Sequence, residues 1–282
     1  MKMIPQFSVS GLDIFNACAV RSNDKALIAR LQNGASSVLR AEQQLIEDWA
    51  AGDPSAYLKR QRFPLLCDAD ELKDVYERVL VGGNERPTYE KIKASAGKIC
   101  PQCGVGRIRT LDHYLPKSKA PELSVVPANL IPVCGDCNFE KLDQQPSSLN
   151  ECVFNPYFDD WRGYSLLHAS VFLTPEAVVH FRIDQPHGCP DEIFERAKAT
   201  FIAFNFEETL SVAASGMMKD VKTNCQRFSD LGEPQRSEAV RSWLQDQFNG
   251  HVADYPNGWR AAMYKAYLES DQFVEGGYNL LP

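Results

Sequence analysis

Two pairs of cysteines at the same short spacing constrain the fold of this chain more than any other feature. The first pair is Cys100–Pro–Gln–Cys103, and after 30 intervening residues comes the second, Cys134–Gly–Asp–Cys137. Each C-x-x-C pair can form a tight turn that points two thiolates at one metal ion, and four thiolates make a closed, structural zinc site. Gly104 suits the tight backbone after the first pair. We therefore expect one Zn²⁺ bound by Cys100, Cys103, Cys134 and Cys137; the alternatives are two unrelated pairs or a redox dithiol.

The other five cysteines are scattered singly, and we interpret them as buried or incidental thiols: Cys18, Cys67, Cys152, Cys189 and Cys225. An odd total of nine does not suit a disulfide framework, and paired cysteines in a reducing compartment indicate metal ligands. The sequence contains neither an apolar run of signal-peptide length nor one of transmembrane length. We therefore expect a cytoplasmic protein with no membrane association.

Charge limits how the chain can act on nucleic acid. The 282 residues carry a net charge of −7, and the pI is near 5.3. A protein that coats nucleic acid is usually basic. Any contact with nucleic acid is therefore expected to be local. A local contact is sufficient for an enzyme, because an enzyme binds its substrate only briefly. A hydrophobic fraction of 44% and a charged fraction of 24% are those of an ordinary globular protein.

Hydrophobic periodicity predicts helices on both sides of the cysteine-containing stretch. Residues 11–95 are expected to be mainly helical, with one helix closed by Gly52 and another capped by Asp68 or Asp70. Residues 165–173 and 177–184 are predicted to be strands joined by a turn at 174–176, and helices resume from Asp191. The predicted fold class is α+β: a mainly helical protein with an embedded zinc-stabilised module. The expected domains are a helical region (1–97), the module (98–145) and a strand pair with helices (146–282).

A second set of polar residues lies between and just after the cysteine pairs: Asp112, His113, Asn129 and Asn138. An isolated Asp–His pair is ordinarily structural, and an asparagine at a helix start is often only a cap. Hydrolysis of a phosphodiester, however, needs a base for the attacking water and a cation for the phosphate charge. A neutral histidine is a suitable base at cellular pH, and amide and carboxylate oxygens suit Mg²⁺ or Mn²⁺.

The string TLDHYLPKSKAPELSVVPANLIPVCGDCNFEK resembles the core of HNH (ββα-metal) endonucleases that carry a four-cysteine zinc site. The resemblance implies a β-hairpin and a helix around one divalent metal, Mg²⁺ or Mn²⁺. It implies that His113 is the general base, that Asp112 and Asn138 are metal ligands, and that Asn129 braces the hairpin. Many relatives have histidine at the position of Asn138. Neighbouring strand residues point to opposite faces, so Asp112 and His113 can share a site only where the strand bends or ends.

Basic residues gather in this part of an otherwise acidic chain. Arg107, Arg109, Lys117 and Lys119 lie within 13 residues that contain one acid, Asp112. We expect Arg109, Lys117 and Lys119 to contact the sugar-phosphate backbone without reading bases, although a solvated loop is the plainer interpretation. The resemblance also implies that Lys141 contacts the phosphate.

Three functions are compatible with these residues. The first is a metal-dependent endonuclease acting on DNA. Its motif is similar to HNH nucleases of bacterial anti-phage defence, including the nuclease subunit of Septu-type systems, which acts with an ATPase partner. The second is a non-catalytic zinc module that binds nucleic acid or protein. The third is a restriction enzyme with its own sequence recognition, for which no reader domain is visible.

Overall fold

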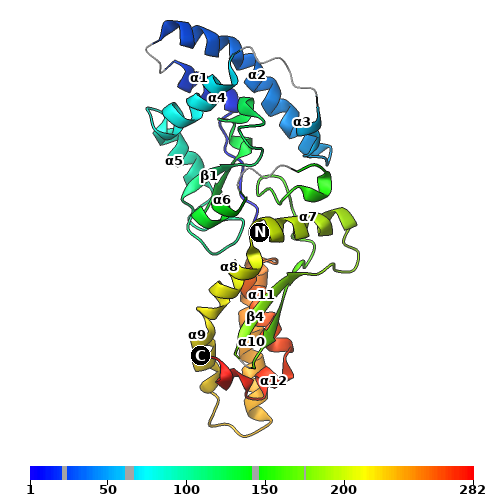
Figure 1. Cartoon of the computed structure of the whole chain (residues 1–282). Coiled ribbons are helices and arrows are strands. Elements are labelled where there is room, and N and C mark those ends of the chain that lie inside the picture. The colour runs from blue at the N-terminus through cyan, green and yellow to red at the C-terminus, as the bar shows by residue number, and fades with distance from the viewer. Residues whose placement is uncertain (21–23, 61–66, 142–145, 175) are drawn as a thin grey trace. The chain divides into compact units, whose positions relative to one another are not determined.

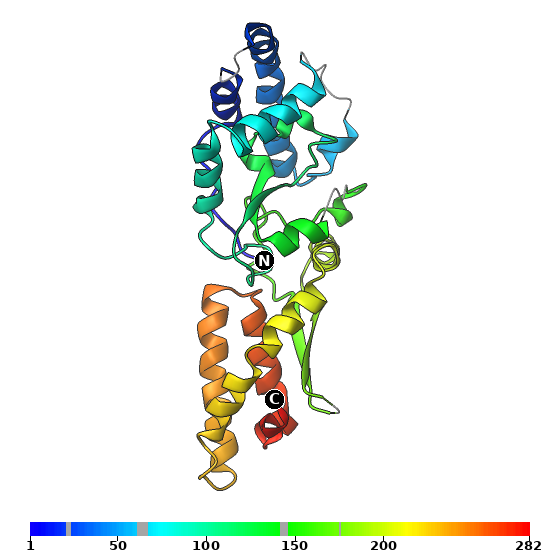
Figure 2. The ribbon, with the colours of Figure 1, turned by 60° about the vertical axis from the view of Figure 1, so that its left-hand side comes forward.

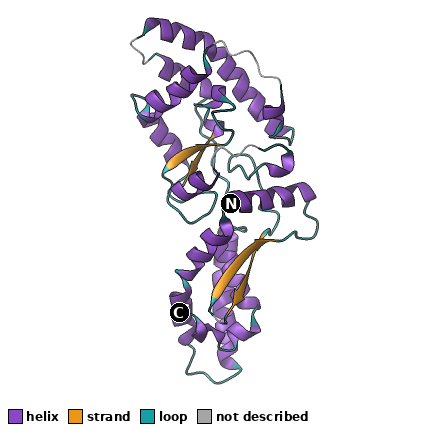
Figure 3. Cartoon of the chain, viewed as in Figure 1, coloured by secondary structure: helices purple, strands orange, loops and turns teal. Residues whose placement is uncertain are grey.

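The computed structural model describes residues 1–20, 24–60, 67–141, 146–174 and 176–282. The fold is α+β and mainly helical, with two separate antiparallel sheets of two strands each, as predicted from the sequence (Figure 3). Packing divides the chain into two compact units. The N-terminal unit contains residues 3–102 and 106–159, and the C-terminal unit contains residues 160–282 with 1–2 and 103–105. Within the described residues, no helix combines the length and apolarity needed to cross a bilayer.

The N-terminal unit consists of helices around one hairpin (Figure 1). Its elements are α1 (Gly11–Ala19), α2 (Lys25–Ala50), α3 (Ala56–Lys59), α4 (Ala69–Asp74), the π-helical segment η1 (Val75–Val81), α5 (Arg86–Ser95), β1 (Thr110–His113), the 3-10 turns η2 (Pro121–Leu123) and η3 (Pro127–Asn129), β2 (Leu130–Val133), α6 (Gly135–Lys141) and the 3-10 turn η4 (Leu149–Glu151). The three predicted domain ranges stay a prediction, and most of 98–145 packs in the same unit as residues 3–97.

Two helix starts in this unit follow from side-chain caps. Asp24 accepts hydrogen bonds from the first backbone N–H groups of α2, and Asp68 forms a capping box with Glu71 at the start of α4. Of the two predicted caps of that helix, Asp68 is the one used. The sequence indicates two helical segments between residues 26 and 52, whereas the structure has the single helix α2. Gly34 lies inside it because a Cβ there would be 2.4 Å from the Cys67 sulfur.

The core of the N-terminal unit connects the helices to the hairpin. Leu31, Val38 and Leu45 recur every seven residues along α2, and all are buried. The hairpin contributes Leu111 and Leu130, which are also buried. Helix α5 packs against both strands, so the site-bearing hairpin has helical support on one side.

The C-terminal unit contains β3 (Leu167–Phe172), β4 (Val178–Ile183), α7 (Asp191–Ala203), α8 (Phe206–Ser215), α9 (Met218–Gln226), α10 (Gln235–Asp254), α11 (Trp259–Glu269), α12 (Asp271–Val274) and the 3-10 turn η5 (Gly277–Leu280). Both strands form as predicted; the predicted turn between them includes Pro175, which lies outside the described residues. The apolar pattern of 208–228 predicts one helix, but the chain breaks at Gly216 into α8 and α9.

Packing within the C-terminal unit centres on α11, which lies beside α10 (Figure 2) and also contacts β3. Helix α8 covers β4, and the Ser211 hydroxyl donates to the Val179 carbonyl over 2.8 Å. The buried Asn257 side chain accepts from the Leu166 N–H over 2.8 Å and donates to the Tyr164 carbonyl over 2.9 Å. This amide therefore ties the loop before β3 to the start of α11.

Candidate active site and metal centre

The four paired cysteines form one cluster. The sulfurs of Cys100, Cys103, Cys134 and Cys137 lie within 4.8 Å of one another, and all four residues are buried. Backbone N–H groups point at two of these sulfurs: Val105 donates to Cys103 and Cys137 donates to Cys134, each over 3.4 Å. Four converging sulfurs that accept N–H bonds fit a tetrahedral Zn²⁺. The predicted ligand set is therefore assembled as a possible metal site, and zinc is the metal that its chemistry favours.

Two glycines shape the first cysteine turn. Gly104 has φ +69°, a conformation that L side chains rarely adopt. A Cβ on Gly106 would lie 2.9 Å from the Cys134 sulfur. The turn closes through an antiparallel bridge between Ile99 and Arg107. The sequence analysis anticipated the role of Gly104, whereas the need for Gly106 depends on contact with the distant second pair.

The segment between the cysteine pairs is a hairpin followed by a helix. β1 and β2 pair in antiparallel register, with Asp112 opposite Ile131 and His113 opposite Leu130. Cys134 directly follows β2, and Cys137 lies in the first turn of α6. The cysteine cluster therefore fixes the strand-to-helix junction. Strand β1 ends at His113, which is the condition for Asp112 and His113 to serve one site.

The ring of His113 is fixed by a carbonyl and an aromatic ring. Its Nε2 lies 2.9 Å from the backbone carbonyl oxygen of Ser124. A carbonyl only accepts hydrogen bonds, so this contact assigns the proton to Nε2 and leaves the lone pair on Nδ1. The ring of Tyr76 meets the imidazole edge to face, with centroids 4.5 Å apart. His113 is thereby held in an orientation and a tautomer that suit a base at Nδ1.

Burial lowers the pKa of His113 to about 4. The hydrogen bond to Ser124 acts in the opposite direction, and the positive charges of Lys117 and Lys141 lower the pKa further. The residue keeps a partly exposed surface. At neutral pH the imidazole is therefore uncharged and able to accept a proton.

Asn129 is fully buried and binds the loop that follows β1. Its Oδ1 accepts from the Leu115 N–H over 2.8 Å, and its Nδ2 donates to the Leu115 carbonyl over 3.0 Å and to the Leu123 carbonyl over 3.4 Å. Leu123 precedes Ser124, whose carbonyl meets His113. Asn129 therefore links the loop after β1 to the segment that meets His113, and its role as the brace implied by the resemblance stays a prediction.

Asp112 is paired with Lys141. The Lys141 ammonium lies 2.9 Å from an Asp112 carboxylate oxygen and donates to the His113 carbonyl over 2.8 Å. Its side chain is only 4% exposed. In this structure Lys141 thus binds Asp112 and the His113 carbonyl, and its expected contact with phosphate stays a prediction. Because burial of a charge is costly without a partner, this pair also stabilises the contact between α6 and β1.

Asn138 lies three residues before Lys141 on α6 and is partly exposed. Residues three apart lie on the same face of a helix. Asn138 is therefore on the same face of α6 as Lys141, the residue that contacts Asp112. Within the described ranges, the four cysteines are the one group of three or more His, Cys, Asp or Glu side chains close enough to hold a metal. Asp112 and Asn138 offer two oxygen donors, which suit a hard cation, provided that the Lys141 ammonium leaves the carboxylate.

The other predicted substrate contacts have different surroundings. Lys117 forms an ion pair with Glu77 and lies 5.3 Å from the centre of the Tyr76 ring. Lys119 and Arg109 are exposed.

Tyr76, Glu77 and the carbonyl of Ser124 are neighbours of the site that the sequence did not predict. Tyr76 and Glu77 belong to η1 and have no sequence signal beyond helical periodicity. A backbone carbonyl has no signal at all.

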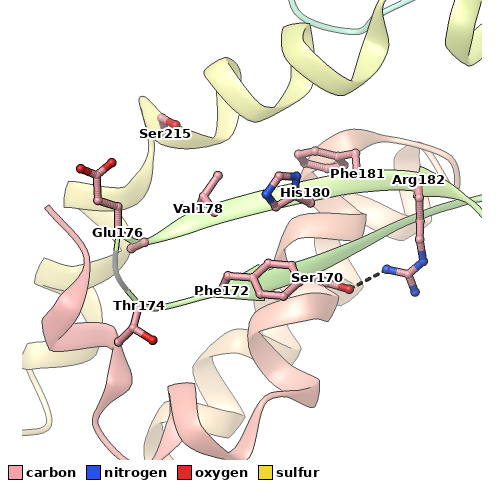
Figure 4. A pocket seen from close by; sticks show the side chains of 10 residues that line it. Ser170, Phe172, Thr174, Glu176, Val178, His180, Phe181, Arg182 and Ser215 are labelled. Carbon is pink, nitrogen blue, oxygen red and sulfur yellow. Dashed lines mark hydrogen bonds between the residues drawn. The ribbon is translucent and has the colours of Figure 1, made fainter.

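A groove in the C-terminal unit has a volume of about 840 Å³ and is lined by none of the predicted site residues. It lies over the outer face of the β3–β4 hairpin (Figure 4), where Arg182 donates to the Ser170 hydroxyl over 2.6 Å. The rings of Phe172 and His180 meet edge to face, with centroids 5.4 Å apart. These contacts agree with a structural role for His180.

Comparison with known proteins finds a relative in a bacteriophage. Protein ea31 of Escherichia phage lambda is 29% identical to this chain over 221 residues, which cover 73% of this chain and 74% of ea31. No protein-family model matches the chain, and no solved structure matches it. A similarity over 221 residues extends well beyond the 48 residues of the predicted module, so the two chains share features outside the cysteine-containing region.

Proposed function

We propose that this protein is a metal-dependent endonuclease of the HNH type that hydrolyses phosphodiester bonds in DNA. The observation that carries the proposal is the fixed imidazole of His113, whose Nε2 meets the Ser124 carbonyl and whose Nδ1 keeps its lone pair. This base sits at the end of a strand beside a carboxylate, and the following helix is held by the cysteine cluster.

In the proposed reaction, His113 Nδ1 takes a proton from a water molecule as the water oxygen attacks phosphorus. The P–O bond to the leaving oxygen breaks, and that oxygen takes up a proton from solvent. Asp112 and Asn138 would hold a divalent Mg²⁺ or Mn²⁺, which when bound supplies positive charge for the phosphate. Asn129 keeps the histidine in place through Leu115 and Leu123.

Lys141 has a second role in this proposal. An ammonium and a divalent cation repel each other strongly when both lie against one carboxylate. Lys141 would therefore release Asp112 once a cation was bound there, and its ammonium would turn to a phosphate oxygen of the substrate. A lysine is suited to this exchange because its ammonium is a point charge on a flexible stem.

The resemblance of the motif to anti-phage nucleases favours a role in phage–host conflict, with an ATPase as protein partner. The similarity to a protein of Escherichia phage lambda supports a setting that involves phage. A non-catalytic zinc module that binds nucleic acid or protein remains the alternative function. The two proposals differ in one respect: the non-catalytic module requires the four cysteines but does not require His113.

The test is cleavage of supercoiled plasmid by zinc-loaded protein with Mg²⁺ or Mn²⁺, compared with a His113→Ala variant. Loss of the base should slow cleavage by about 10²- to 10⁴-fold. His168→Ala is a matched control, because the His168 Nε2 also lies 2.9 Å from a backbone carbonyl, that of Ser165. Equal cleavage by wild type and His113→Ala would overturn the mechanism. A wild type that cuts with neither metal would favour the non-catalytic alternative.

A further inference from the structure

Charge is distributed unevenly along the chain. Residues 86–119 contain eight Lys and Arg against two Asp and Glu, a net charge of +6 in a protein whose total is −7. The remaining residues therefore carry a net charge of −13. A local excess of this size sets up a positive potential near the hairpin.

Two exposed cations of this stretch lie beside the cysteine cluster; we name Arg107 and Arg109 the knuckle cluster. Ile99 bridges to Arg107, and the Ile108 N–H donates to the Lys98 carbonyl over 3.0 Å. Residues 98–100 and 106–108 are thus neighbouring antiparallel segments. Arg107 and Arg109 lie two apart on an extended segment and share one face of it, whereas Lys98, opposite Ile108, projects from the other face.

The knuckle cluster has no acidic partner among the residues that the structure describes. Three other cations of residues 86–119 are paired: Arg86 and Lys93 both bind Glu90, and Lys117 binds Glu77. Two cations that share a face and have no acidic partner repel each other, and an external anion would relieve that repulsion.

The knuckle cluster leads along the chain to the candidate active site. The Arg109 N–H donates to the Val133 carbonyl over 2.8 Å, which extends the pairing of β1 and β2 by one step. Asp112 follows three residues later, about 10 Å further along an extended strand. One strand of a nucleic acid carries a phosphate per about 3.4 Å of axis, so 10 Å corresponds to about three nucleotides.

We infer that Arg107 and Arg109 bind the sugar-phosphate backbone of a DNA duplex a few nucleotides from the bond that is cut. Guanidinium groups match phosphate oxygens in pairs, and contacts of this kind set position without reading sequence. The inference rests on the proposed function, because the strand that carries the arginines ends at the proposed base. An acidic protein partner is the competing occupant that the experiment must distinguish.

The experiment measures binding of full-length, zinc-loaded protein to a fluorescent 25-base-pair DNA of arbitrary sequence, without Mg²⁺ or Mn²⁺, from 50 to 200 mM salt. A double variant, Arg107→Gln and Arg109→Gln, removes about two phosphate contacts. The slope of log affinity against log salt should become shallower by about 1.8. Over this salt range, the wild type should then lose about 12-fold more affinity than the variant.

Arg162→Gln is the matched control, an exposed arginine bound to Asp160 in the C-terminal unit; its slope should equal that of the wild type. Zinc content and circular dichroism of each variant establish that it is folded. An unchanged slope in the double variant overturns the inference, as does equally tight binding of polyaspartate, which would assign the cluster to an acidic protein. Cleavage is scored separately: a wild type that binds through the cluster but never cuts supports the inference while the nuclease proposal fails.

Discussion

Asn129 fixes the loop after β1 through both ends of its side-chain amide. It is fully buried, and it satisfies both the N–H and the carbonyl of Leu115. A hydrocarbon side chain of the same size cannot do this, because buried backbone groups need hydrogen-bond partners. The residue therefore contributes to stability as well as to the position of His113.

Replacing Asn129 with alanine should destabilise the protein by about 3 kcal/mol. The change leaves two buried backbone groups without partners, and each costs about 1–3 kcal/mol. The measurement is the denaturant midpoint of zinc-loaded protein, followed by circular dichroism. Asn249→Ala is the control, since Asn249 is exposed on α10 and accepts only from Gln245 among the described contacts; it should change stability by less than about 0.5 kcal/mol. Equal midpoints for the two variants would show that Asn129 is no brace.

For single residues, the sequence predicted those whose roles depend on their spacing along the chain. It did not predict the residues whose roles depend on tertiary contacts. The cysteine ligands were predictable because C-x-x-C pairs have one dominant geometry. The partner of Lys141 was not, because its pairing with Asp112 requires α6 to pack against β1. For the same reason no sequence pattern signals that the Ser124 carbonyl meets His113.

The helix α6 shows how the cysteine cluster supports the candidate site. It has only seven residues, fewer than an isolated helix needs to be stable in water. Cys137 lies in its first turn, and Cys134 immediately precedes it. Metal binding at the cluster would therefore hold both Asn138 and Lys141 in place, since both belong to this helix.

Removing the metal should release α6 and the hairpin. We expect one zinc per chain, measured by mass spectrometry of the purified protein, and loss of that zinc in Cys134→Ser. Hydrogen exchange should then speed up across β1, β2 and α6, because zinc binding and folding of such modules are coupled. Cys152→Ser is the control, since Cys152 is a buried thiol that donates to the Ser148 carbonyl; it should keep its zinc. Zinc retained at full occupancy in Cys134→Ser would remove this residue from the ligand set.

Element boundaries were predictable where caps mark them and not where packing overrides local pattern. Asp68 begins α4, and β3 and β4 lie within the predicted ranges. The sequence suggested two helices where the structure has the single helix α2. Gly34 lies within α2 because the helix approaches Cys67 closely there, and it does not break the helix. Single-sequence periodicity cannot distinguish these two uses of glycine.

For the whole molecule, the nine thiols differ in burial, and their reactivity therefore tests both the cysteine cluster and the packing within each unit. All nine are free of disulfides. Four lie in the cluster, and Cys18, Cys152, Cys189 and Cys225 are buried elsewhere. Burial raises the pKa of Cys225 to about 12 and that of Cys67 to about 11. Only the thiolate reacts, so even Cys67, the one partly exposed cysteine, should react slowly at neutral pH.

Zinc-loaded native protein should therefore offer a disulfide reagent such as DTNB about one slowly reacting thiol at neutral pH. The rate should rise about tenfold per pH unit below the pKa of Cys67, because the thiolate fraction does. Cys67→Ala should abolish this phase, and a zinc chelator should add four thiols as the cluster opens. All nine should react in denaturant with chelator. Five or more thiols reacting rapidly in the native, zinc-loaded protein would mean that the cluster binds no metal, and the support it gives to the hairpin and α6 would have to come from packing alone.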